Sequence, residues 1–403
     1  MLGRAIDSLL GADESPEVRR HVGTLTAARI CTNACYRFAP PFLALIARGV
    51  GVSLQDIGIA LAIAELAGLM SPLTGRLVDR LPRRTALATG LLGVGLGTVL
   101  AASSTSLVMF AVALVLLSQA KVMFDLGLGA WIADHVPYER RGRVVGLTET
   151  SWALGLLVGV SVMGVITGLT SWRVGYLVGA GTVLLMAAVV GRGIRPEPRA
   201  DTSDHHDQRA GGLGLASLGT YGWLIVAGEC LLMMSSQTLF VTFGSWLGDV
   251  FGFGAVGISA VVFGLGLGEL AASITSVRRT DVWGKETSAA RGAMVMVPAA
   301  IALALGHGHL AIGIAALVVA VLGFEFAIVS IISVGTSLVP NRPARGLGIL
   351  LAGGTMGRAI ASVPATRLYE RDGMVAPAIM CAVLATCAAV TMLVAHRAGT
   401  RPR

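Results

Sequence analysis

Long apolar stretches recur along the whole chain, and they constrain its fold more than any other feature. The hydrocarbon core of a bilayer is about 30 Å thick, and a helix needs about 20 apolar residues to cross it. We therefore predict an all-α membrane protein with twelve transmembrane helices. The predicted spans are 24–47, 54–74, 86–105, 107–131, 144–167, 174–194, 220–245, 255–277, 290–307, 310–335, 346–367 and 375–396.

The shortage of charge supports the same conclusion. Only 13% of the residues are charged, whereas a soluble domain has about 25%. The chain therefore lacks the polar surface to cover a water-soluble fold of this size, so we predict that the lipid bilayer surrounds it. The 53 glycines fit this prediction, because small residues let helix backbones approach closely in lipid.

A net charge of +8 raises the question of nucleic-acid binding. The basic residues, however, lie in short clusters between the apolar stretches. Aromatic residues make up only 5% of the chain, too few to form stacking platforms for bases. We therefore predict no nucleic-acid partner.

The basic clusters also predict the orientation in the membrane. Of the 31 Lys and Arg residues, 23 lie on one side of the twelve predicted spans, four lie on the other, and four lie within spans. Cytoplasmic loops carry the excess of Lys and Arg. We expect a multi-pass protein of a bacterial-type inner (cell) membrane with both termini in the cytoplasm. The first 22 residues are polar and predict no cleavable signal peptide.

One long polar break divides the chain. Residues 195–219 are charged and glycine-rich, which predicts a flexible cytoplasmic linker. The expected domains are a six-helix bundle at 1–194 and a second one at 220–403.

The two halves resemble each other at a nearly constant offset of 200 to 204 residues. Glu65 corresponds to Glu269, and Phe124-Asp125 corresponds to Phe324-Glu325. Such repetition indicates duplication and two related bundles, an architecture expected of many secondary transporters.

A motif after the second predicted span connects the chain to a known family. Residues 75–84 read GRLVDRLPRR and resemble the loop signature of the major facilitator superfamily, G-x-L-x-D-R-x-G-R-R, with Pro82 at the second glycine. The resemblance covers the whole chain through span number and orientation. It implies the major facilitator fold, which is two pseudo-symmetric six-helix bundles, and transport by alternating access.

The motif also predicts a cytoplasmic gate. Gly75 permits a tight turn as the chain leaves the helix. The resemblance implies that Asp79 faces the start of span eleven near Gly346, and that the arginines reach Asp134. Alternatively, the arginines only enforce topology. The predicted gate residues are Gly75, Asp79, Arg80, Arg83, Arg84, Asp134 and Asp281.

Glycines in the fifth span bear on the direction of transport. Most of the spacing of the family's antiporter motif is matched by Gly146, Gly155, Gly159 and Gly164. Val160 and Met163 replace a proline and a glycine of that motif. The spacing favours export, and the alternative is simple close packing of helices.

Ionisable side chains at membrane depth are functional candidates, because lipid penalises them strongly. The resemblance implies that spans 1, 4, 7 and 10 line a central cavity. Predicted cavity residues are Arg29, Arg37, Lys121, Glu229 and Arg358.

Lys121 and Asp125 are four residues apart and face each other on a helix. Arg29 or Arg37 can reach Asp125 from span one, and such a pair would couple proton movement to rearrangement if the acid is protonated. We predict Asp125 as the proton site and Glu325 as the second choice. The alternative is a permanent structural ion pair. For Glu65 and Glu269 we favour a structural role.

These features predict a monomeric, proton-coupled exporter of a small organic solute, similar to drug:proton antiporters and sugar-efflux permeases. An uptake symporter or facilitator for an organic anion or sugar is the alternative, with Arg29, Arg37 and Arg358 binding a carboxylate. A non-transporting receptor on the same fold predicts large soluble appendages, and this sequence shows none. The sequence shows no nucleophile elbow, phosphate loop or metal cluster, so we predict no enzyme, no cofactor and no metal site.

Overall fold

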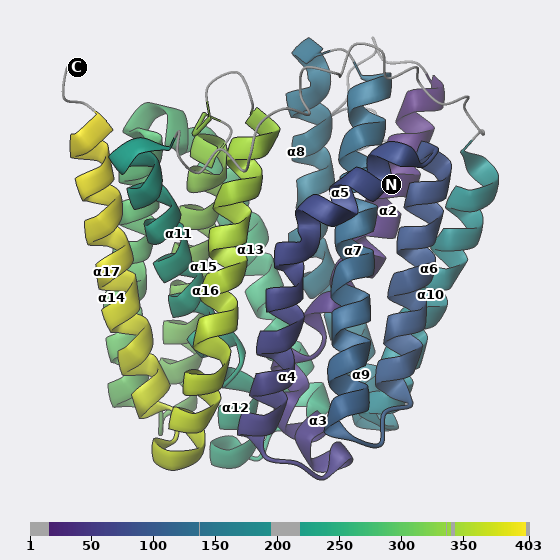
Figure 1. The fold of residues 1–403 in the computed structure, drawn as a ribbon. Helices are drawn as coiled ribbons and strands as arrows, with labels where there is room; N and C mark the ends of the chain where they lie inside the picture. Colours follow the sequence, from purple (N-terminus) through teal and green to yellow (C-terminus); the bar gives the residue numbers. More distant parts are fainter. Residues whose placement is uncertain (1–15, 137, 195–217, 336, 340–342, 400–403) are drawn as a thin grey trace. The chain divides into compact units, whose positions relative to one another are not determined.

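The computed structural model describes residues 16–136, 138–194, 218–335, 337–339 and 343–399. Within these ranges every regular element is helical, which confirms the predicted all-α fold (Figure 1). Ten helices of the described part are long and apolar enough to cross a membrane, or eleven if one bent pair is a single span. The twelve spans predicted are therefore nearly all present as helices.

The helices form two compact units, and each is described by itself. The first unit contains residues 1–51, 70–199 and 254–266. Its helices are α2 (Pro16–Arg37), η1 (Pro40–Phe42), α3 (Leu43–Val50), α5 (Ser71–Arg80), α6 (Arg83–Ala102), α7 (Leu107–His135), α8 (Tyr138–Leu154), the π-helical η3 (Gly155–Val160), α9 (Ser161–Leu169), α10 (Trp172–Gly193) and the beginning of α13 (Ala255–Trp283).

The second unit contains residues 52–69, 200–253 and 267–403. Its helices are α4 (Leu54–Ala67), η2 (Gly68–Met70, at its edge), α11 (Gly219–Phe240), α12 (Phe243–Phe251), the rest of α13, α14 (Lys285–Gly306), α15 (Leu310–Gly335), α16 (Pro343–Asp372) and α17 (Val375–Gly399). Although α4 comes early in the sequence, it belongs here because it packs along α16 (Figure 1). Nearly all of the predicted linker 195–219 lies outside the described residues, and the predicted bundles 1–194 and 220–403 stay predictions.

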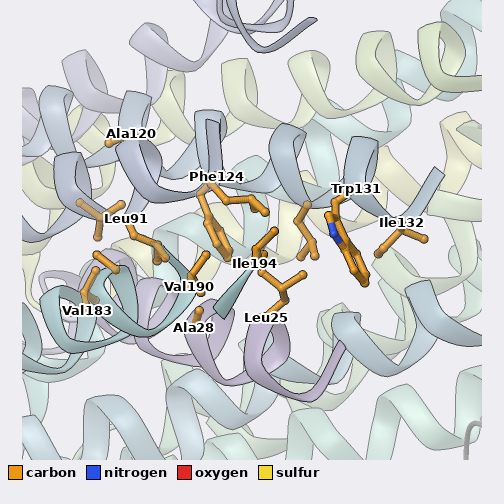
Figure 2. Close-up of a cluster of buried hydrophobic side chains, with 14 of the residues drawn as sticks. Leu25, Ala28, Leu91, Ala120, Phe124, Trp131, Ile132, Val183, Val190 and Ile194 are labelled. Atoms are coloured by element: carbon orange, nitrogen blue, oxygen red, sulfur yellow. The ribbon is translucent and has the colours of Figure 1, made fainter. Parts of the chain in front are cut away.

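Apolar side chains lie both inside the helix packing and on its outer surface. In the first unit, Leu25, Leu91, Phe124 and Val190 form a buried cluster where α2, α6, α7 and α10 meet (Figure 2). On the outer side of the helices, large side chains such as Leu96 of α6 are more than half exposed. Many large apolar side chains exposed on the helices suit contact with lipid tails rather than water.

The first predicted span, 24–47, is broken. Helix α2 ends at Arg37, a short 3-10 turn follows at Pro40–Phe42, and α3 begins at Leu43. Proline has no backbone N–H to donate to the preceding turn, so two successive prolines interrupt the helix. The kink predicted at Pro40–Pro41 is in fact a complete break between two helices.

The second predicted span, 54–74, also differs from a continuous helix. Helices α4 and α5 are separate helices joined through η2. The tight turn predicted at Gly75 is wrong, because Gly75 lies inside α5. The chain turns instead at Leu81, which is extended (ψ 147°). This conformation is favoured because the residue before a proline avoids the helical region.

Candidate functional site

The first unit brings together four charged side chains from three helices. Asp125 of α7 accepts hydrogen bonds from Lys121 Nζ at 2.5 Å and from Arg29 Nε of α2 at 3.1 Å. Arg29 also donates through Nη1 to Glu149 of α8 at 2.7 Å. Two acids and two bases thus form one continuous chain from α7 through α2 to α8, with no formal net charge.

Asp125 is the central member of this charge cluster. Its two carboxylate oxygens bind different cations, one on its own helix and one on α2. Its side chain is 27% exposed, whereas those of Arg29 and Lys121 are only 13% and 10% exposed. Protonation of Asp125 would weaken both pairs at once, because charge-assisted hydrogen bonds lose much of their strength when one partner becomes neutral. Asp125 is therefore the carboxyl group through which α7 is joined to α2.

Two aromatic rings stand beside the charge cluster, and the sequence analysis missed both. The Arg37 guanidinium lies 4.5 Å from the ring centroid of Trp152 and donates to the Trp152 carbonyl at 3.0 Å. Lys121 Nζ is 5.5 Å from the Tyr36 ring and 5.8 Å from the Trp152 ring. Cations at these distances interact with aromatic faces. The proximity of Tyr36 to Arg37 and of Trp152 to Glu149 in the sequence was the available signal.

Close packing of span five on α2 positions these groups. A Cβ added to Gly155 would lie 2.7 Å from the Cβ of Asn33, and one added to Gly159 would collide with Ala34. Asn33 also donates to Ser151 Oγ at 3.2 Å. The two glycines therefore let α2 approach closely enough for Arg29 to reach Glu149. At the predicted Gly146, by contrast, an added Cβ would meet no atom within 4 Å.

Glu325 of α15, the second predicted proton site, is buried in the second unit. It accepts a hydrogen bond from Ser273 Oγ of α13 at 2.7 Å. One to two turns further along the two helices, the hydroxyls of Ser276, Thr280 and Ser330 lie within 2.9–3.1 Å of one another. The contact between α13 and α15 around Glu325 is thus rich in hydroxyl groups, which can stabilise either form of a carboxyl.

The remaining membrane-depth charges also lie in the second unit. Arg358 of α16 donates through Nη2 to Glu65 of α4 at 3.0 Å, a pair that the sequence analysis did not predict. Glu229 of α11 and Glu269 of α13 are both fully buried. The predicted cavity residues are therefore divided between the units, with Arg29, Arg37 and Lys121 in one and Glu229 and Arg358 in the other.

At the predicted gate, Arg83 Nε lies 2.7 Å from Asp134 Oδ2. This ion pair joins the start of α6 to the end of α7. Asp79 and Arg80 are exposed on α5, and Arg84 is partly exposed on α6. The side chain of Asp281, in α13, lies outside the described part. The predicted contact of Asp79 with the start of α16 stays a prediction.

Metal-binding side chains do not cluster in the part of the chain that the structure describes: it holds no group of three or more His, Cys, Asp or Glu residues placed to bind an ion. The linker histidines His205 and His206 lie outside the described residues.

Comparison with known sequences gives a family match. The model of the Major Facilitator Superfamily matches residues 25–362. The uncharacterized MFS-type transporter YwfA of Bacillus subtilis (strain 168) is 31% identical over 118 residues, covering 28% of this chain and 29% of YwfA. The putative uncharacterized transporter YgaY of Escherichia coli (strain K12) is 30% identical over 181 residues, covering 43% of this chain and 44% of YgaY. Each alignment spans less than half of the relative.

Solved structures share the fold at low sequence identity. A bacterial homolog of the human lysosomal transporter Spinster matches with a TM-score of 0.78 at 15% identity, covering 95% of this chain and 99% of the homolog. The human organic anion transporter MFSD10 matches with a TM-score of 0.65 at 19% identity, covering 94% of this chain and all of MFSD10.

Proposed function

This chain belongs to the major facilitator superfamily of membrane transporters, and from that premise we propose that it couples proton movement to the efflux of a small organic solute. The observation that carries the proposal is the position of Asp125, whose carboxylate holds Lys121 on its own helix and Arg29 on α2. Ionisable side chains at membrane depth are energetically costly, and those that occur typically belong to substrate pathways or proton relays.

The mechanism begins with Asp125 ionised and both cations bound to it. A proton that reaches the partly exposed carboxyl removes the charge that attracts Arg29 and Lys121. Arg29 then keeps its partner Glu149 on α8, so the contact between α2 and α7 loosens while that between α2 and α8 persists. A change in the packing of α2 that depends on protonation is the kind of two-state element that alternating access requires.

The same cluster offers a surface for the solute. Trp152 lies beside Arg37 and Lys121, and Tyr36 lies beside Lys121. Release of Lys121 from Asp125 would leave this cation beside the Tyr36 and Trp152 rings, a combination that suits an organic anion with an apolar or aromatic body. Because this cation is freed when Asp125 is protonated, the chemistry favours an organic anion that moves together with a proton, which is the second candidate function. Exchange requires instead that the solute binds while Asp125 is ionised.

Direction and coupling can be tested together in proteoliposomes that contain a pH-sensitive dye. A panel of aromatic carboxylates and sugars is added outside, and the internal pH is followed without any imposed pH gradient. Exchange of solute for protons makes the interior more alkaline, whereas proton symport makes it more acidic. Alkalinisation that is absent from protein-free vesicles supports the proposal. Acidification would favour the uptake alternative, and solute entry without any pH change would rule out proton coupling.

A further inference from the structure

Helix α16 of the second unit lies between α4 and α11, and glycines bring it close to both. Its contacts with α4 run antiparallel. The facing pairs are Gly68 with Thr355, Glu65 with Arg358, Gly58 with Thr366, and the Leu54 amide with the Glu370 carboxylate. Arg358 is therefore the residue through which α16 forms an ion pair with Glu65 of α4.

The contacts of α16 with α11 run parallel. The facing pairs are Val226 with Gly353, Glu229 with Gly354, Cys230 with Gly357, Met233 with Arg358, and Gln237 with Ser362. A Cβ added to Gly354 would lie only 2.9 Å from Glu229 Oε1. The carboxyl group of Glu229 thus lies directly in the contact between the two helices.

Glu229 has an unusual environment for an acidic side chain. It is 0% exposed, and among the described residues neither of its carboxyl oxygens has a hydrogen-bond partner. Arg358 is near enough to interact with it electrostatically. The Arg358 Nη1 atom lies 3.8 Å from the sulfur of Met233, a residue about one turn (about 6 Å) beyond Glu229 along α11. A small movement of the guanidinium would therefore bring it from Glu65 to Glu229.

Other helices contribute no nearer charge among the described residues. Helix α17 places Met392 against α11 at Gly228. Glu286 of α14 accepts from Tyr221, about 12 Å before Glu229 along α11. On α15, Glu325 follows Phe324, whose ring packs on Phe240, about 16 Å beyond Glu229. Arg358 is thus the charged group that faces Glu229, with Glu65 on its other side.

We propose that Arg358 exchanges between Glu65 and Glu229, and that Glu229 binds a proton while Arg358 is paired with Glu65. A buried carboxylate needs a cation or hydrogen bonds, and in this arrangement the proton takes their place. When the proton leaves for the aqueous phase, the ionised Glu229 attracts Arg358, and the contact of α16 with α4 weakens. The inference deepens the proposed proton coupling, on which it rests, by adding a second proton site.

Infrared spectroscopy of the purified protein tests this proposal without a known solute. The difference spectrum between acidic and alkaline buffer reports the C=O stretch of each carboxyl that binds a proton. Glu229→Gln should remove the contribution of one carboxyl, and Glu229→Asp should restore a shifted one. The matched control Glu286→Gln, in the first turn of α14, should leave the Glu229 contribution intact. Size-exclusion profiles identify any variant that fails to fold.

Exchange of Arg358 is tested by Glu65→Gln. Without Glu65 as a partner on α4, Arg358 should pair with Glu229. The proton affinity of Glu229 should then fall at least tenfold, which moves the midpoint of the Glu229 band to lower pH by one unit or more. A spectrum unchanged by Glu229→Gln would overturn the proton site. A midpoint unchanged by Glu65→Gln would overturn the exchange. Either result leaves coupling through Asp125 intact, so failure here is distinguishable from failure of the proposed function.

Discussion

Substitution of Gly155 by alanine probes the close packing that holds the charge cluster together. The new Cβ would lie 2.7 Å from the Cβ of Asn33, whereas carbon atoms in contact prefer about 3.5–4.0 Å. Helix α2 must therefore move away from η3 by about 1 Å. Overpacking of this kind typically costs about 1–3 kcal/mol of stability.

The same displacement reaches the ion pairs. Asn33 follows Arg29 by one helical turn, and Arg29 is 2.7 Å from Glu149 and 3.1 Å from Asp125. A shift of about 1 Å away from η3 stretches the distance between Arg29 and Glu149, which lies on the helix that leads into η3, beyond hydrogen-bonding range. Gly155→Ala should thus lower both the free energy of unfolding and the rate of proton-coupled transport.

Gly146→Ala is the matched control, since an added Cβ there meets no atom within 4 Å. Alanine in an unobstructed helix should leave stability unchanged or raise it by about 0.5–1 kcal/mol. Denaturant titration followed by tryptophan fluorescence in detergent measures both variants. If Gly155→Ala is as stable and as active as Gly146→Ala, the reasoning about close packing is wrong.

Three further substitutions test other parts of the account. Arg83→Gln should reduce the turnover measured in proteoliposomes through loss of the Asp134 contact, while stability changes by at most about 1 kcal/mol because the pair is partly exposed; unchanged turnover would count against a gate. Ser273→Ala should destabilise the protein by about 1–3 kcal/mol in denaturant titration, because the buried Glu325 loses a hydrogen bond; an unchanged midpoint would mean that Glu325 does not need it. In a chain without its native cysteines, Arg80→Cys should react with an impermeant thiol reagent only from the cytoplasmic side, and labelling from outside would reverse the proposed topology.

The sequence predicted the helical architecture well, because lipid permits few alternatives. Length and apolar composition are sufficient to mark a span such as that of α15. The breaks were harder to predict. The double proline at Pro40–Pro41 indicated a kink, but its severity depends on how α3 packs, and the motif glycine Gly75 proved helical because the next proline moved the turn to Leu81.

The charge cluster was predictable only in part. The spacing of Lys121 and Asp125 places them on one face of a helix, and the sequence left Arg29 and Arg37 open as the partner from span one. The structure pairs Arg29 with Asp125 and adds Glu149 as the fourth member. The pair of Arg358 with Glu65 could not be predicted from either helix alone, because the two residues are 293 positions apart. Tyr36 and Trp152 were missed because their proximity in the sequence to Arg37 and Glu149 does not show which side chains face each other before the helices are placed.

The claim that Asp125 couples proton movement to transport is tested most directly by solute transport in the Asp125→Asn variant. Asparagine keeps the shape of the side chain and cannot be deprotonated. Two rates are compared in the same proteoliposomes, namely movement driven by a pH gradient and solute exchange without one, with Asp372→Asn as an exposed control. We expect Asp125→Asn to abolish the first rate and retain the second. Full proton-driven transport by this variant would contradict the assignment of Asp125 as the coupling residue.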